Sequence, residues 1–214
     1  MRLRNVPGAR EILQSTPGFI PEPENLKGKW AEHFNNSHPI HIEVGSGKGK
    51  FVTTLALQKE DINFIAIEKF ATVLLKLVKK IPEDGCPNLA ILNTDAEMLT
   101  QFFEPGEIHK IYLNFSDPWP RKRHAKRRLT HVRFLETFKT LLKSDGTISL
   151  KTDNHELFDF SIGQFELAGY LLEDITYDLH HSTLSQENVT TEYEERFISQ
   201  GMPIYGLTAY KNTL

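Results

Sequence analysis

Short apolar runs that alternate with helix-spaced apolar residues constrain the fold of this chain more than any other feature of its sequence. From residue 39 onward, compact apolar runs predict strands, and the stretches between them carry apolar residues every three or four positions, as helices do. The expected strands are 40–44, 63–67, 89–92, 111–115, 147–150, 170–177 and 204–210. The expected helices begin near Phe51 and cover 70–81, 96–103, 134–142 (stopping at Asp145-Gly146), 158–165 (closed by Gly169) and 192–199. This alternation predicts an α/β fold with a mostly parallel sheet, helices on both faces and an antiparallel edge strand.

The length and composition agree with one such domain. Apolar residues make up 39% of the 214 residues and charged residues 25%, which excludes a disordered chain. The single cysteine, Cys86, excludes a disulfide framework and a thiolate-rich metal site, so no metal is expected. No apolar run is long enough to span a membrane and no signal peptide is visible, so we expect a soluble, cytoplasmic protein. Residues 1–38 carry four prolines and predict a partly flexible arm with a short helix at 9–14, ahead of a domain at 39–214.

The positive charge of the chain is concentrated in residues 121–133, the basic segment. It contains seven Lys and Arg residues and no Asp or Glu, and taking them from the net charge of −3 leaves −10 on the rest of the chain. An acidic body with one dense cationic segment is typical of a protein that binds a polyanion at one place. A solvated surface helix is the structural alternative, and a membrane surface is disfavoured because no apolar face accompanies the charges.

A glycine-rich turn follows the first expected strand. Glu43 precedes three alternating glycines, Gly45, Gly47 and Gly49. The spacing does not fit a phosphate-binding P-loop, and a dinucleotide fingerprint needs its third glycine one residue later. Glu43 would also repel a pyrophosphate. S-adenosylmethionine, which carries a sulfonium and an ammonium but no phosphate, fits better, and a plain tight turn remains the structural alternative.

Acidic residues follow the next three expected strands as well. These are Glu68, Asp95 and Asp117. Ligands bind at the carboxyl ends of the strands in open α/β sheets, and several carboxylates gathered there favour a cationic ligand. Glu68 is placed to bind ribose hydroxyls. The structural alternatives are a helix-start acid for Glu68 and a helix N-cap for Asp95.

The most distinctive run is residues 116–120, the proline loop, in which Pro118 and Pro120 flank Trp119 directly after Asp117. Two prolines restrict the backbone on both sides and predict a stiff loop that presents one acid and one indole. Trp119 could stack on a nucleic-acid base or wedge the loop into the fold. The basic segment begins at the next residue.

These motifs make the chain resemble the tRNA (guanine-N7-)-methyltransferase family of the bacterial TrmB type. The resemblance rests on residues 43–49, 114–120, 123–128, 152–154 and 191–194. It implies a class I S-adenosyl-L-methionine-dependent methyltransferase fold, Rossmann-like, that methylates N7 of a guanosine in the variable loop of tRNA. It leaves a monomer and a homodimer both open.

The resemblance also implies roles for individual residues. Asp117 would be catalytic, and the cofactor would be bound by Glu43, Gly45, Gly47, Glu68, Asp95 and Asp117. The substrate would be bound by Arg121, Asp153, Thr191, Glu192, Tyr193 and Glu194, and RNA by Arg123, His124, Lys126, Arg127 and Arg128. Arg121 departs from the family, which usually has lysine there, so the charge is kept but the contact geometry is not.

Structural alternatives accompany the late motifs too. Thr191 and Glu194 have the spacing of a helix capping box, and Asp153 or Asn154 could cap the helix that follows. Two other functions stay open at this point. One is a catalytically silent RNA-binding module, and the other is a methyltransferase acting on a small molecule or a protein.

Overall fold

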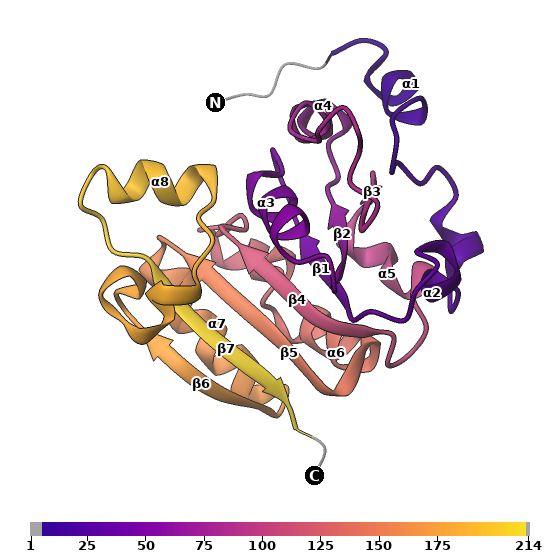
Figure 1. Ribbon diagram of the computed structural model, residues 1–214. Coiled ribbons are helices and arrows are strands. Elements are labelled where there is room, and N and C mark those ends of the chain that lie inside the picture. The colour runs from indigo at the N-terminus through magenta and orange to yellow at the C-terminus, as the bar shows by residue number, and fades with distance from the viewer. Residues whose placement is uncertain (1–5, 213–214) are drawn as a thin grey trace. The chain divides into compact units, whose positions relative to one another are not determined.

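The computed structural model describes residues 6–212 and divides into two compact units after Glu104 (Figure 1). We call them the first unit and the second unit and describe each by itself. None of the helices in residues 6–212 is both long and apolar enough to cross a membrane.

The first unit is built on three parallel strands in the order β3-β2-β1. They are β1 (Ile40–Val44), β2 (Asn63–Ile67) and β3 (Leu89–Leu92), and all three lie where the apolar runs predicted them. Their side chains are almost entirely buried, which is why β2 and β3 read as nearly continuous apolar runs, while β1 places His41 and Glu43 between its apolar residues. The helices between and after them are α3 (Lys50–Gln58), α4 (Ala71–Val78), η2 (Ala96–Met98) and α5 (Leu99–Phe102).

The described part of the N-terminal segment packs against this unit. It contains α1 (Ala9–Gln14), η1 (Pro23–Leu26) and α2 (Trp30–His33), and α1 contacts α4. The Ile20 amide donates to the Ile91 carbonyl at 3.0 Å, and Phe19 and Ile91 form an isolated parallel bridge beside β3. Trp30 is fully buried and donates from its indole nitrogen to the Phe102 carbonyl at 2.9 Å. The helix expected at 9–14 is confirmed, while the division of the chain at residue 38 stays a prediction.

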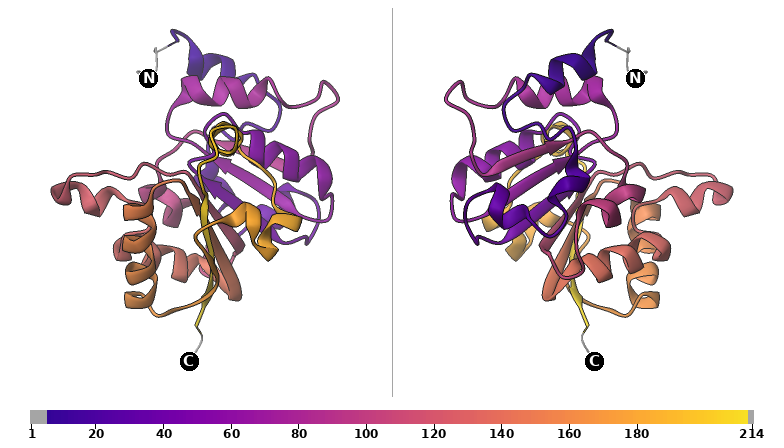
Figure 2. Two further views of the ribbon diagram at one scale, coloured as in Figure 1. Left: turned by 90° about the vertical axis from the view of Figure 1, so that its left-hand side faces the viewer. Right: turned by 90° about the vertical axis from the view of Figure 1, so that its right-hand side faces the viewer.

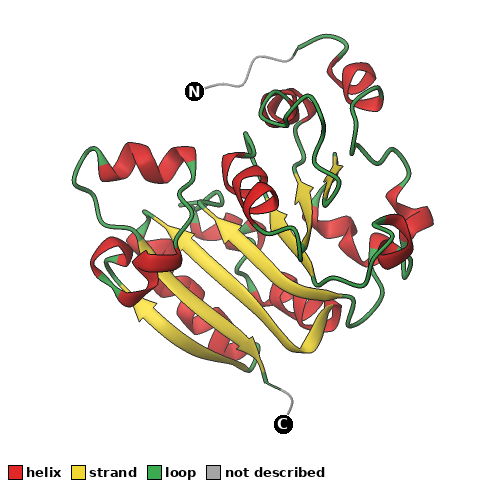
Figure 3. Cartoon of the chain, in the orientation of Figure 1, coloured by secondary structure: helices red, strands yellow, loops and turns green. Residues whose placement is uncertain are grey.

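The second unit has four strands in the order β4-β5-β7-β6 (Figures 1 and 3). They are β4 (Ile108–Asn114), β5 (Leu142–Thr152), β6 (Tyr170–Thr176) and β7 (Tyr205–Lys211). β4 and β5 pair in parallel, and β7 runs antiparallel to both β5 and β6, so the expected antiparallel pairing at the sheet edge is confirmed. The helices are η3 (Lys122–Arg127), α6 (Val132–Leu141), α7 (His155–Leu167), η4 (Leu179–His181), η5 (Thr183–Glu187) and α8 (Glu192–Ile198), of which α6 and α7 pack on the sheet.

Several boundaries in this unit differ from the prediction, for example β4 begins at Ile108 rather than at residue 111, and the largest errors lie at one junction. The helix expected to run to Asp145-Gly146 ends at Leu141, and β5 begins at Leu142 rather than at residue 147. In the register, Ile108 pairs with Leu142 but Lys110 pairs with Thr147, so the residues between Leu142 and Thr147 bulge out of the ladder. The helical apolar spacing continues through Leu142, and only pairing with β4 assigns this residue to the sheet.

Candidate functional site

The glycine turn of the first unit joins β1 to α3. Gly45, Gly47 and Gly49 all have positive φ angles, of 82°, 57° and 79°, a region that favours glycine. A Cβ on Gly49 would collide with the side chain of Leu77, so this glycine also allows α3 to start close against α4. A Cβ on Gly45 would meet nothing within 4 Å, so there is open space beside the first glycine.

The amides of this turn are mostly used by the chain itself. The amides of Gly45 and Ser46 donate to the Ile67 carbonyl at 2.8 and 2.9 Å, and the Gly47 amide donates to Glu68 Oε2 at 3.1 Å. A phosphate-binding loop needs such amides to point at the ligand. The turn is therefore not a phosphate cradle, which supports the expectation of a ligand without phosphate.

Two buried carboxylates lie at the ends of adjacent parallel strands beside this turn. Glu43 is 2% exposed and Glu68 is 9% exposed. The second oxygen of Glu68 accepts from the Phe70 amide at 2.9 Å, so Glu68 braces both the turn and the start of α4. The Ser46 hydroxyl is also buried, and no described residue bonds to it. Carboxylates and an unsatisfied hydroxyl together suit a cationic ligand that carries hydroxyl groups.

Asp95 has the structural role that its position after β3 allowed. Its carboxylate accepts from the Glu97 amide at 3.1 Å and so caps η2. It also forms an ion pair with Lys69 at 2.7 Å between Nζ and Oδ2. The N-cap alternative for Asp95 is confirmed, and its cofactor role stays a prediction.

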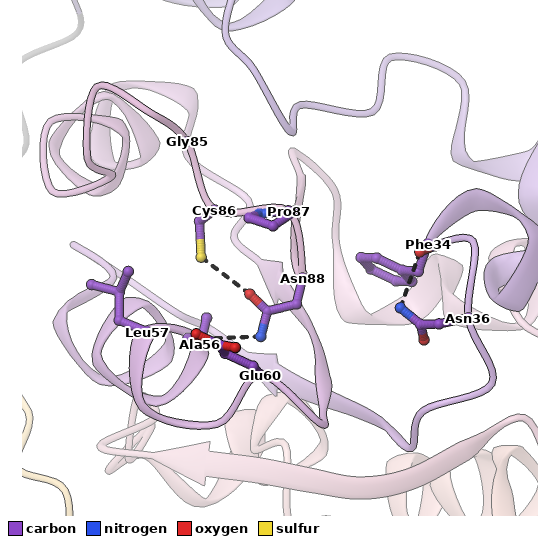
Figure 4. Close-up of a pocket in the computed structure, with 9 residues that line it drawn as sticks. All are labelled: Phe34, Asn36, Ala56, Leu57, Glu60, Gly85, Cys86, Pro87 and Asn88. Carbon is purple, nitrogen blue, oxygen red and sulfur yellow. Dashed lines mark hydrogen bonds between the residues drawn. The ribbon is translucent and has the colours of Figure 1, made fainter.

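The first unit also contains a pocket whose lining includes none of Glu43, Glu68 and Asp95. Figure 4 shows Asn88 and Cys86 among the residues that line it. The Asn88 amide nitrogen donates to the carbonyls of Ala56, Lys59 and Ile62, and its oxygen accepts from the Cys86 thiol. Burial raises the pKa of the Cys86 thiol, so the reactive thiolate is disfavoured. The hydrogen bonds of Asn88 hold the surrounding loops together.

The proline loop of the second unit follows β4. Its neighbour Phe115 and its own Trp119 both have positive φ angles, of 50° and 42°, which cost an ordinary residue roughly 1–3 kcal/mol each. Asp117 lies exposed between them, and no described residue forms a hydrogen bond or an ion pair with its carboxylate. A strained backbone therefore holds a carboxylate that is open to a ligand.

The basic segment contains two kinds of side chain. Residues 122–127 of it form η3, and Arg121, Arg123, Lys126 and Arg127 are exposed. Figure 2 shows the segment projecting beside α6 and α7. Arg128 is different, because it is 9% exposed and donates to loop carbonyls. The exposed cations have the arrangement expected for phosphate contacts.

Trp119 packs against the basic segment. Its ring meets the His124 ring edge to face at a centroid distance of 5.8 Å, and the Arg127 guanidinium lies 4.9 Å from its centre. Of the two roles predicted for this indole, the structure shows packing within the fold: Trp119 connects the proline loop to η3.

Asp153 is not the cap of the next helix. The Asn154 side chain accepts from the Leu157 amide at 2.8 Å and caps α7. Asp153, half-buried beside it, forms no hydrogen bond with any described residue. Its carboxylate is therefore available for a ligand at the carboxyl end of β5.

The capping box predicted as the structural reading of residues 191–194 is present. The Thr191 hydroxyl accepts from the Glu194 amide at 3.0 Å, and Glu194 Oε2 accepts from the Thr191 amide at 3.3 Å. Glu194 is fully buried and also bonds to Lys151 and Asn188. Tyr193 is instead exposed and stacks on Phe115 at 6.3 Å, so α8 lies beside the strand end that carries the proline loop.

Lys151 is a site residue that the sequence did not reveal. It lies at the end of β5 with its side chain 6% exposed, and its ammonium donates to Asn188 Oδ1, the Val189 carbonyl and Glu194 Oε2 at 2.8–2.9 Å. The local sequence gives no signal for it, because β5 contains several other polar residues. A buried lysine almost always has a charged partner, and here the fold supplies it. Lys151 fastens the segment before α8 to the sheet.

Comparisons with known proteins agree with this arrangement. A family model described as “Putative methyltransferase” matches residues 37–207. A tRNA (guanine-N(7)-)-methyltransferase of Lachnoclostridium phytofermentans is 52% identical over 99% of both chains, and one of Brevibacillus brevis is 51% identical over 98% of both. The solved structure of the 16S rRNA methyltransferase KamB is similar with a TM-score of 0.63 at 15% identity, over 86% of this chain and 92% of that one.

The fold, the glycine turn and the family match define a class I methyltransferase. The likeness to KamB concerns the fold alone, because the identity is low. The relatives that share half of the sequence over nearly the full length are more specific. The chain belongs to the tRNA (guanine-N(7)-)-methyltransferase family.

Proposed function

We propose that this protein transfers a methyl group from S-adenosylmethionine to N7 of a guanosine in the variable loop of tRNA. The observation that carries the proposal is the exposed, unbonded Asp117 carboxylate on a strained loop that runs directly into exposed cations. The half-identical relatives that bear this enzyme name support the substrate. Because tRNA is modified in the cytoplasm of bacteria, we propose that the protein acts there.

The first unit would hold the methyl donor, which supplies an electrophilic methyl group on a positively charged sulfur. Gly45 and Gly47 leave the turn free of side chains where the ligand approaches. Glu68 and Asp95 would accept hydrogen bonds from hydroxyl groups, and Glu43 would balance positive charge. The buried hydroxyl of Ser46 adds an unsatisfied partner to this set.

Methylation at guanine N7 requires few catalytic groups from the protein. N7 of guanine already presents a lone pair and needs no general base. Positive charge develops on the guanine ring during transfer, and the Asp117 carboxylate would stabilise it, as preorganised groups stabilise developing charge in other enzymes. Positioning the two reactants in line supplies the remaining advantage.

Asp153 would recognise the guanine. The N1–H and the exocyclic amino group of guanine are donors that suit a carboxylate, and Asp153 has no other described partner. We assign Glu194 a positioning role instead, because its oxygens already bond to the chain. The residues left for substrate contact are the exposed Arg121 and Tyr193 and the half-buried Glu192, with Thr191 capping the helix that carries Glu192 and Tyr193.

The function is tested by incubating the protein with S-adenosylmethionine and unmodified tRNA, followed by nucleoside analysis. We expect 7-methylguanosine at one position, in the variable loop. Cofactor binding by calorimetry without any methylated nucleoside would favour a methyltransferase of other substrates. Binding of tRNA without cofactor binding would favour the silent RNA-binding module.

The exposed cations should supply the salt dependence of tRNA binding. Changing Arg123, Lys126 and Arg127 together to alanine should weaken binding and reduce the slope of log affinity against log salt by about 2, since each lost phosphate contact lowers it by roughly 0.7–0.9. Binding measured at several salt concentrations checks this. A matched variant with alanine at Lys29, Lys59 and Lys79, which are exposed on the first unit, should keep the wild-type slope. Equal slopes in both variants would show that the basic segment does not bind RNA.

A further inference from the structure

Arg128 stands apart from the other cations of the basic segment. Its neighbours Lys126 and Arg127 are exposed, whereas Arg128 is 9% exposed. Burying a guanidinium is costly unless it is paired or hydrogen-bonded, so its contacts must supply the compensation. A buried guanidinium is also poorly placed to release counterions from a phosphate backbone.

The contacts of Arg128 go to the proline loop. Its Nε donates to the Pro118 carbonyl at 2.8 Å and its Nη2 to the Trp119 carbonyl at 3.3 Å. These are the residues directly after Asp117. Two consecutive carbonyls accept from one planar guanidinium, a fork geometry that arginine has and lysine lacks.

Little else in the described chain holds this loop by hydrogen bonds. Pro118 and Pro120 have no amide to donate. Across residues 6–212, no other hydrogen bond is formed by the backbone of 116–120. The preceding residue, Phe115, is anchored separately by its amide to the Lys151 carbonyl at 2.8 Å.

The guanidinium is itself held from the other side. Its carbon lies 4.3 Å from the centre of the Phe160 ring, on α7, in a cation–π contact. The backbone around it is turned by bonds from the Arg128 amide to Ala125 and from the His131 amide to the Arg128 carbonyl. Arg128 therefore connects α7, which packs on the sheet, to the loop that carries Asp117.

From this geometry we infer that Arg128 is a positioning residue that fixes the Asp117 loop, and does not bind RNA phosphate. The inference rests on the proposed function for its effect on catalysis. Without the two bonds, the positive φ of Trp119 loses its support and Asp117 moves away from its place. A small misplacement of a catalytic group lowers the rate far more than it lowers substrate affinity.

The test compares arginine-to-lysine changes at a buried and an exposed position. Arg128→Lys keeps the charge but loses the fork, and should lower kcat for tRNA methylation by about 10- to 100-fold with KM for tRNA and the salt slope near wild type. Arg10→Lys, the same change at an exposed position of α1 that has no assigned role, should keep kcat. An Arg128→Lys variant with wild-type kcat and a changed salt slope would overturn the inference in favour of phosphate binding.

A second readout does not depend on activity. The chain has two tryptophans, Trp30 and Trp119, and Trp30 is fully buried, so acrylamide quenching of fluorescence reports mainly on Trp119. Arg128→Lys should raise the quenching constant while the thermal melt stays cooperative, and Arg10→Lys should leave the quenching constant unchanged. Unchanged quenching in Arg128→Lys would overturn the positioning role. If the wild-type protein methylates no tRNA but Arg128→Lys still raises the quenching constant, the proposed function is refuted. The structural role of Arg128 in holding the proline loop is then still supported.

Discussion

Replacing Asp117 with alanine is expected to lower the rate of methyl transfer to tRNA by about 100- to 1,000-fold, the usual loss when a preorganised charge-stabilising group is removed. The carboxylate has no described partner in the chain, so its removal should leave the fold and its stability close to wild type. The measurement is transfer of labelled methyl to unmodified tRNA at saturating substrate, with a thermal melt in parallel.

Two further variants sharpen this experiment. Asp117→Asn keeps the size of the side chain and removes its charge, so it should lose nearly as much activity as Asp117→Ala if charge stabilisation is the role. Asp84→Asn, an exposed acid on the first unit, should keep full activity. Full activity in Asp117→Ala would remove Asp117 from the mechanism, whatever the fate of the other site residues.

The buried pair of Lys151 and Glu194 should have the largest effect on stability. Replacing Lys151 with methionine leaves the Glu194 carboxylate buried without its ammonium, and breaking one side of a buried ion pair costs about 3–5 kcal/mol. We expect Tm to fall by roughly 10 °C. Methylation of tRNA should fall as well, because Lys151 fastens the segment before α8, and Tyr193 on that helix stacks on Phe115.

The control for this prediction removes the second charge. Adding Glu194→Gln to Lys151→Met leaves an acceptor for the capping box and no unpaired charge, so the double variant should be more stable than Lys151→Met alone. Lys211→Met is a matched control. Lys211 is more exposed than Lys151, and within residues 6–212 its ammonium donates only to the Leu142 carbonyl, so this change should lower Tm by less. If the double variant is no more stable than Lys151→Met, the charges of Lys151 and Glu194 are not what stabilises the segment before α8.

The parts of the fold that the sequence predicted well are local or fully buried. β1, β2 and β3 were predicted to the residue because each is a short, mostly apolar run that ends at polar or turn-forming residues and is covered on both faces. The start of β5 was not predictable, because Leu142 continues a helical spacing and joins the sheet only by pairing with Ile108. Strand pairing over such a distance leaves no local pattern.

The site divides in the same way. The positions of Glu68, Asp95 and Asp117 after consecutive parallel strands were predicted from sequence, where α/β folds bind ligands, and their roles in binding and catalysis stay predictions. Lys151 could not, since its partners lie about 40 residues later in the chain and nothing near it in sequence indicates them.

The sequence alone determined that this chain alternates strands and helices, collects acids after its strands and concentrates positive charge in one segment. Only the tertiary structure decided which of those charges meet solvent. Arg127 and Arg128 are adjacent and chemically identical, yet one is exposed and the other is buried against the proline loop and Phe160. The physical reason is that burial of a side chain depends on elements brought to it from elsewhere in the chain, and the cost of burying a charge is met only by partners that those elements supply.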